Sequence, residues 1–165
     1  MIAAFFISYY KMSWIHHKSI VMGGLVAIGF DRANHYLLAV SHSGRGLFKL
    51  ESGERIARDY EDWAGRAWYS PDDNRCEGIG PLQNETFDIV GLHGGVAYEE
   101  AANGMLKCRV ERNEYAWRAL ITREGIDEEI CSDEEDLKGV ALSRDGKWFV
   151  VGISSEIEIY RNTAA

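Results

Sequence analysis

The stretch VALSRDGKWFVVGISSEIEIYRN, residues 140–162, decides the fold class of this chain. Asp145 and Gly146 form a dipeptide that is typical of two-residue hairpin turns, in which both central residues adopt positive φ. Apolar residues alternate with others on both sides of this turn, as they do along half-buried strands. The alternating positions are Val140 and Leu142, then Phe149, Val151 and Ile153, then Ile157 and Ile159. The stretch therefore predicts three antiparallel strands joined by tight turns.

The same pattern occurs twice more, and an internal repeat of this kind must be found before the fold is assigned. Residues 28–50 align without gaps with residues 140–162, so that Arg32 meets Arg144. Residues 77–95 align with the first copy in the same way. The three copies span approximately residues 24–65, 75–120 and 138–162. We therefore expect one mainly β domain over residues 1–165, an antiparallel meander of three repeated hairpin units with at most one or two short helices.

The segment SRDGKWFVVGISSEIEIYR, residues 143–161, resembles one blade of the WD-type and related β-propellers. The resemblance covers about half of the chain and implies propeller-like sheets, although propellers typically have about four to eight blades. Two alternatives to a single-chain propeller are a flattened barrel formed by one chain and a ring completed by a homodimer. Of these two, we favour the fold that is closed within one chain. The third copy lacks a fourth strand, which residues 3–10 are expected to supply.

Composition and charge narrow the class of protein. Hydrophobic residues make up 46% of the chain, and 26 acidic residues against 18 basic ones give a formal net charge of −8. This charge repels nucleic acid and attracts basic proteins. The apolar run near the N-terminus is too short to span a bilayer, so we expect no membrane partner. Three cysteines without a CxxC pair indicate no disulfide framework and favour a cytoplasmic location.

His42 lies between Ser41 and Ser43 and is the first candidate for catalysis. Neighbouring residues on a strand point to opposite faces, so neither serine can readily meet the imidazole in line, and we interpret the position as a hairpin turn. The alternative is a small hydrolase or ligand-binding β-protein that uses His42 together with His93. The spacing of the histidines and cysteines matches no metal-ligand pattern, and no phosphate-binding motif is present, so we expect no metal and no cofactor.

An acidic segment, residues 123–139, is the main candidate for partner binding, and we expect it to be an exposed loop or helical turn. A run of carboxylates steers a basic protein toward its docking site, although such runs also serve solubility alone. Residues 54–68 show helical spacing that competes with a strand. The residues that we expect to bind a partner are Asp127, Glu128, Glu129, Asp133, Glu134, Glu135 and Asp136, with Trp63 and Trp68 as aromatic anchors.

These features favour a non-enzymatic module that binds a protein, most simply a basic one. Its small size, its acidity and the lack of a catalytic motif make the profile similar to that of bacterial immunity proteins, which cover the active site of a toxin with an acidic surface. We therefore predict an immunity- or antitoxin-type inhibitor.

Overall fold

The computed structural model describes residues 13–92 and 100–165, and these form four antiparallel sheets. Sheet I contains β6 (Tyr69–Ser70), β7 (Arg75–Glu77) and β8 (Thr86–Asp88). Sheet II contains, in spatial order, β5 (Arg55–Arg58), β4 (Gly44–Lys49), β3 (Tyr36–Ser41), β2 (Leu25–Phe30) and β9 (Val90–Gly91). Sheet III contains β1 (Trp14–Val21), β16 (Glu156–Asn162), β15 (Trp148–Ile153) and β14 (Leu137–Leu142). Sheet IV contains β10 (Glu100–Ala101), β11 (Leu106–Arg112), β12 (Trp117–Arg123) and β13 (Ile126–Asp133).

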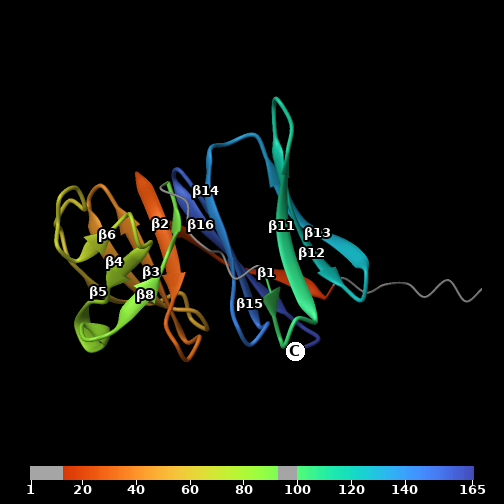
Figure 1. Cartoon of the computed structure of the whole chain (residues 1–165), viewed down its shortest axis with the longest axis horizontal. Coiled ribbons are helices and arrows are strands. Elements are labelled where there is room, and N and C mark those ends of the chain that lie inside the picture. Colours follow the sequence, from red (N-terminus) through yellow and green to blue (C-terminus); the bar gives the residue numbers. More distant parts are fainter. Residues whose placement is uncertain (1–12, 93–99) are drawn as a thin grey trace, which may run out of the picture.

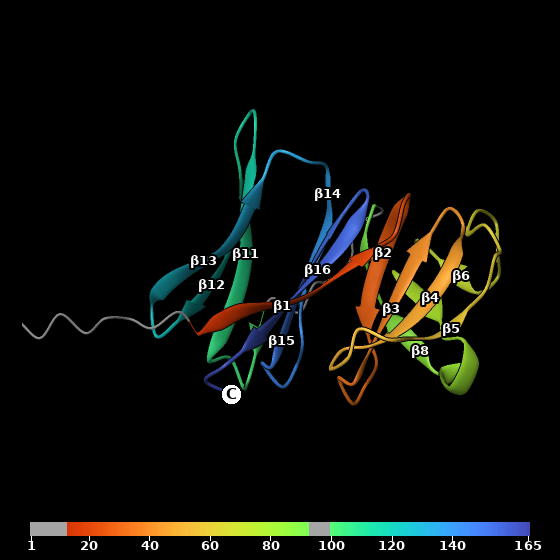
Figure 2. The same cartoon turned by 180° about the vertical axis from the view of Figure 1, so that it is seen from behind.

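The four sheets stack in the order I, II, III, IV, with an apolar layer between each pair (Figures 1 and 2). Phe87 of sheet I packs in one cluster with Leu38 of sheet II. The other face of sheet II shares a cluster with sheet III, and the far face of sheet III, which includes Phe149, shares one with Ile121 of sheet IV. Sheets II and III are therefore covered on both faces, and every residue of β2 and of β15 is buried.

The prediction of a mainly β fold with few helices is confirmed. Within the described ranges the helical structure is a single 3-10 turn, η1 (Gly80–Leu82). No helix in the described part of the chain is long and apolar enough to cross a membrane. The expectation of a closed fold is wrong, because the described strands form four open sheets and no closed barrel.

The first and third copies of the repeat each form one meander. The first supplies β2 to β5 of sheet II, and the third supplies β14 to β16 of sheet III. The segment 75–120 is instead divided among sheets I, II and IV. The strand at the start of this segment, β7, cannot continue through residues 80 and 81. Gly80 adopts a positive φ of 58°, and Pro81 lacks the backbone N–H that a ladder of strand hydrogen bonds requires.

The third copy is completed by a strand from the N-terminal region, as expected, but that strand is β1. It pairs with β16 from Trp14 to Val21, and Trp14 and Ile20 are its buried residues. The predicted strand over residues 3–10 lies outside the described residues. Sheet III therefore joins a segment near the start of the chain to its C-terminal segment.

Two local predictions are corrected. The acidic segment is neither a loop nor a helical turn over most of its length, because residues 126–133 form β13, which pairs with β12 along nearly its whole length. This pairing supplies the backbone hydrogen bonds that the charged sequence alone does not indicate. The competing helix over residues 54–68 does not form, since Arg55–Arg58 is β5 and pairs with β4.

Candidate functional site

His42 occupies the turn between β3 and β4, as the sequence predicted. The hydroxyl of Ser41 is buried and donates a hydrogen bond to the carbonyl oxygen of Gly44 at 3.0 Å. The Nδ1 atom of His42 lies 3.1 Å from Nε1 of Trp63, whose N–H donates to it. Neither hydrogen bond joins a serine to the imidazole, so this turn does not hold the pair that nucleophilic catalysis requires.

His93 lies outside the described residues, so a site shared by His42 and His93 stays a prediction. No cluster of histidine, cysteine and carboxylate side chains suited to a metal ion occurs within residues 13–92 and 100–165.

Two of the three cysteine thiols, those of Cys76 and Cys131, are poor candidates for nucleophiles. Burial raises the pKa of the Cys76 thiol to about 12, an effect that the nearby Arg45 only partly offsets. Burial likewise raises the pKa of Cys131 to about 11. Because the thiolate is the reactive form, both side chains are unreactive at neutral pH.

The two tryptophans predicted as anchors differ in accessibility. Trp68 is buried, with the Arg45 guanidinium 4.0 Å from its ring centre and its Nε1–H donating to Glu61 at 3.1 Å. Trp63 is half-buried and packs against Tyr69. Trp68 is thus a core residue, and both tryptophans belong to the sheet I and sheet II end of the stack. The structure does not bring them together with the acidic residues of sheet IV.

Asp127 of β13 is held by groups of its own sheet. Its two carboxylate oxygens accept hydrogen bonds from both terminal nitrogens of Arg109, at 2.9 and 2.6 Å. The hydroxyl of Thr122 donates to the same carboxylate at 2.5 Å. These bonds hold the pKa of Asp127 well below its usual range, because they favour the charged form. The carboxylate is therefore already engaged.

Glu129 lies in the same network of charges on the outer face of sheet IV. Arg118 contacts Glu129 at 3.5 Å and Glu111 at 2.5 Å, and Glu111 also contacts Arg109 at 3.2 Å. All four side chains are at least 40% exposed. Solvent screens such pairs, so they contribute little to stability, but they do neutralise the carboxylates that a basic partner would otherwise meet.

Three further carboxylates of the acidic segment have structural roles. Glu128 accepts hydrogen bonds from the hydroxyl of Ser13 at 2.8 Å and from the backbone N–H of Trp14 at 3.3 Å, which ties the start of β1 to sheet IV. Asp133 accepts the backbone N–H groups of the next two residues, at 2.6 and 3.0 Å, and so orders the turn after β13. Asp136 contacts the Lys138 ammonium group at 2.5 Å.

The remaining acidic side chains, Glu134 and Glu135, line a hollow of about 280 Å³ beside the β11–β12 hairpin, which we call the acidic hollow. This hairpin projects beyond the rest of the body in Figure 1. Tyr115 at its tip is 75% exposed. The lining residues are Arg112, Asn113, Tyr115, Ala116, Trp117, Glu134, Glu135, Asp136 and Leu137.

The walls of the acidic hollow are held in place. The side-chain oxygen of Asn113 accepts the backbone N–H groups of Tyr115 and Ala116, at 2.9 and 2.8 Å, which fixes the hairpin tip. The indole of Trp117 donates to the carbonyl oxygen of Glu135 at 2.7 Å, which fixes the facing loop. The hollow is thus an ordered feature whose lining combines acidic residues with an exposed tyrosine.

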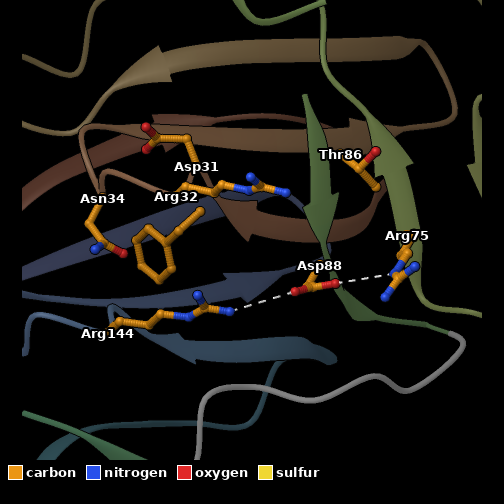
Figure 3. A pocket seen from close by; sticks show the side chains of 8 residues that line it. Asp31, Arg32, Asn34, Arg75, Thr86, Asp88 and Arg144 are labelled. Atoms are coloured by element: carbon orange, nitrogen blue, oxygen red, sulfur yellow. Dashed lines mark ion pairs between the residues drawn. The ribbon is translucent and has the colours of Figure 1, made fainter. Parts of the chain in front are cut away.

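A second polar pocket, of about 530 Å³, lies where sheets I, II and III meet (Figure 3). We call it the arginine pocket. Arg32 comes from the β2–β3 turn, Arg144 from the β14–β15 turn and Arg75 from β7. Asp88 of β8 lies between two of them, 3.5 Å from Arg75 and 3.9 Å from Arg144. The lining residues are Phe30, Asp31, Arg32, Asn34, Arg75, Thr86, Asp88 and Arg144.

Sequence reasoning did not identify the arginine pocket, although one signal was present. Arg32 and Arg144 occupy equivalent positions of the first and third copies of the repeat. Because these copies form the adjacent sheets II and III, their turns bring the two arginines to one pocket. Arg75 comes from a segment whose sheet the repeat does not indicate.

No protein-family model matches the chain, and no curated protein matches it. The functional assignment therefore depends on the geometry of these sites.

Proposed function

We propose that the protein is a non-enzymatic binding module whose acidic hollow receives a lysine or arginine side chain of a basic protein partner. The observation that carries the proposal is that Glu134, Glu135 and the exposed Tyr115 line the same hollow. Carboxylates form charge-assisted hydrogen bonds with cationic groups, and an aromatic face attracts the same cations. Together these groups suit one basic side chain.

The contrast within the acidic segment supports this choice. Asp127 and Glu129 face arginines of their own sheet, and Asp136 faces Lys138. Glu134 is exposed and makes no ion pair in the part of the chain that the structure describes, and Glu135 makes only a long side-chain hydrogen bond of 3.4 Å, to the hydroxyl of Ser155. Arg112 also lines the hollow, so a partner's cation would compete with it for the carboxylates.

The ordered walls favour binding because they lower its entropic cost. Immobilising a side chain or loop on association costs about 0.5–1.5 kcal/mol for each flexible side chain. The turn at Asp133 and the bond from Trp117 to the Glu135 carbonyl fix the loop in advance. Exposed carboxylates also accelerate association with a basic partner.

The specific class that we propose is an immunity- or antitoxin-type inhibitor built on propeller-like sheets in the cytoplasm. The net charge of −8 complements a toxin whose active site is basic, as those that bind nucleic acid are. The four-stranded meander of the first copy, and the three-stranded meander of the third copy that β1 completes, support the propeller-like interpretation. The three cysteines, which are free thiols, support a reducing compartment.

The test uses an arginine-rich peptide as the probe and isothermal titration calorimetry with stopped-flow kinetics as the readout. The double variant Glu134→Lys, Glu135→Lys is compared with Glu51→Lys, Glu54→Lys, which changes the net charge equally at exposed positions of sheet II. We expect the first variant to lose about tenfold or more in affinity, mainly through a slower association rate, and the second to lose far less. Equal losses in both variants contradict the proposal, because they assign the attraction to net charge alone.

A further inference from the structure

We propose that the arginine pocket binds the phosphate group of a small molecule. Three guanidinium groups reach this pocket from three sheets, so they approach a ligand from different sides. A tetrahedral phosphate offers acceptor oxygens in several directions, and guanidinium groups bind them in a bidentate manner. This geometry favours a phosphate over a flat carboxylate.

The charges of the pocket are unbalanced in favour of an anion. Asp31 is buried, and its carboxylate accepts three backbone N–H groups of the β2–β3 turn, at 2.7, 2.8 and 3.2 Å. Its charge is therefore engaged by the backbone. Asp88 is the remaining carboxylate among the described lining residues, which include three arginines, and it contacts Arg75 and Arg144. The pocket thus concentrates positive charge in a protein whose overall charge is −8.

Arg32 is the residue that points most directly to a ligand. Its side chain extends from the β2–β3 turn toward the side of the pocket formed by Thr86 and Asp88 (Figure 3). It makes no ion pair or side-chain hydrogen bond with any residue of the described ranges 13–92 and 100–165. The contact of Asp88 with Arg75, at 3.5 Å, is long and both side chains are exposed, so the Arg75 guanidinium group can turn toward an anion at small cost.

The turns that carry Arg32 and Arg144 are rigid. The bonds to Asp31 fix the first turn. In the second turn, the hydroxyl of Ser143 accepts the backbone N–H of Trp148 at 2.9 Å and donates to the carboxylate of Asp145 at 2.6 Å. A ligand therefore meets arginines whose backbone is already ordered, which lowers the entropic cost of binding. The hydroxyl of Thr86 adds a neutral donor to the same lining.

The experiment titrates the protein with inorganic phosphate and, separately, with glucose 6-phosphate, at constant ionic strength. Calorimetry and the melting temperature report binding, with glucose and chloride as ligand controls. The variants are Arg32→Gln and Arg144→Gln, and the control is Arg55→Gln, an exposed arginine of β5 outside the pocket. All three change the charge equally, and all three sites are exposed, so each variant is expected to fold.

We expect the protein to bind both phosphate probes and to ignore glucose. Each pocket variant should weaken phosphate binding by about tenfold or more, and Arg55→Gln should leave it unchanged. Tighter binding of glucose 6-phosphate than of inorganic phosphate assigns the pocket to a phosphorylated metabolite, and equal binding assigns it to phosphate itself. Absence of binding to either probe, or equal loss in all three variants, overturns the proposal. The acidic hollow lies beside the β11–β12 hairpin of sheet IV and shares no lining residue with the arginine pocket. The result of this experiment therefore does not depend on what the acidic hollow binds.

Discussion

Sheets III and IV stack face to face and each contain four antiparallel strands, yet they differ in how many of their faces are covered. Sheet III lies between two other sheets, and every residue of β15 is buried. Sheet IV packs on sheet III with one face only, and no residue of β13 is fully buried. The comparison teaches that a four-stranded antiparallel sheet is held by apolar packing on both faces in sheet III, whereas the outer face of sheet IV carries exposed ion pairs.

The largest expected effect is in the core of sheet III. Phe149 is 0% exposed and packs against Trp14 and Tyr160. Phe149→Ala removes this packing and leaves a cavity, so we expect the free energy of unfolding to fall by about 3–5 kcal/mol. Ile126→Ala, at a 43% exposed position of β13, should change it by no more than about 0.5 kcal/mol. Urea denaturation measures both variants, and similar losses would contradict the distinction between the two sheets.

An intermediate effect is expected where sheet IV meets the acidic hollow. Trp117→Phe keeps an aromatic ring but removes the N–H that donates to the Glu135 carbonyl at 2.7 Å. We expect a loss of about 1–2 kcal/mol in stability, because a partly buried acceptor loses its donor. The loop that carries Glu134 should also become less ordered, so binding of the arginine-rich peptide should weaken. Unchanged binding with reduced stability would show that the indole supports only the fold.

The smallest expected effect concerns the ion pairs on the open face. The pKa of Asp127 is lowered in the folded state, so its charge stabilises the fold above the unfolded-state pKa of about 4, and this contribution is lost as the pH falls below that value. We expect the difference in urea midpoint between the wild type and Asp127→Asn to be small at pH 7, to shrink below pH 4 and to shrink in 1 M salt.

The control for this measurement is Glu114→Gln, whose carboxylate makes no ion pair with a residue of the described chain. A difference for Asp127→Asn that grows as the pH falls would reverse the sign of the linkage and contradict the assigned hydrogen bonds.

The sequence was sufficient to predict the elements whose apolar pattern and turn chemistry agree. The strands on both sides of Asp145 and Gly146 form as predicted. The turn itself differs from the predicted two-residue form, because β14 ends at Leu142 and β15 begins at Trp148, and of the two turn residues Gly146 alone adopts a positive φ, of 72°. The turn at His42 was predicted for the same reason. In these segments local preference and burial point to the same structure.

The remaining features depend on contacts between distant segments. β13 is a strand because β12 pairs with it, while its own sequence, IDEEICSD, is dominated by charge. The closing strand of sheet III was predicted, but its position at Trp14–Val21 was not, because the polar residues from His16 to Ser19 interrupt the apolar pattern that identifies a strand. The arginine pocket combines turns and strands of three sheets, so no single stretch of sequence describes it.

Hydrogen-deuterium exchange, with and without the arginine-rich peptide, tests most directly whether the open end of sheet IV is the recognition surface. We predict that the bound peptide slows exchange at the β11–β12 hairpin tip, residues 112–117, and in the loop at residues 133–137. Exchange in β15 should stay equally slow in both states, because those amides are already buried in sheet III. Protection confined to other segments, or no protection at a saturating peptide concentration, would contradict the account.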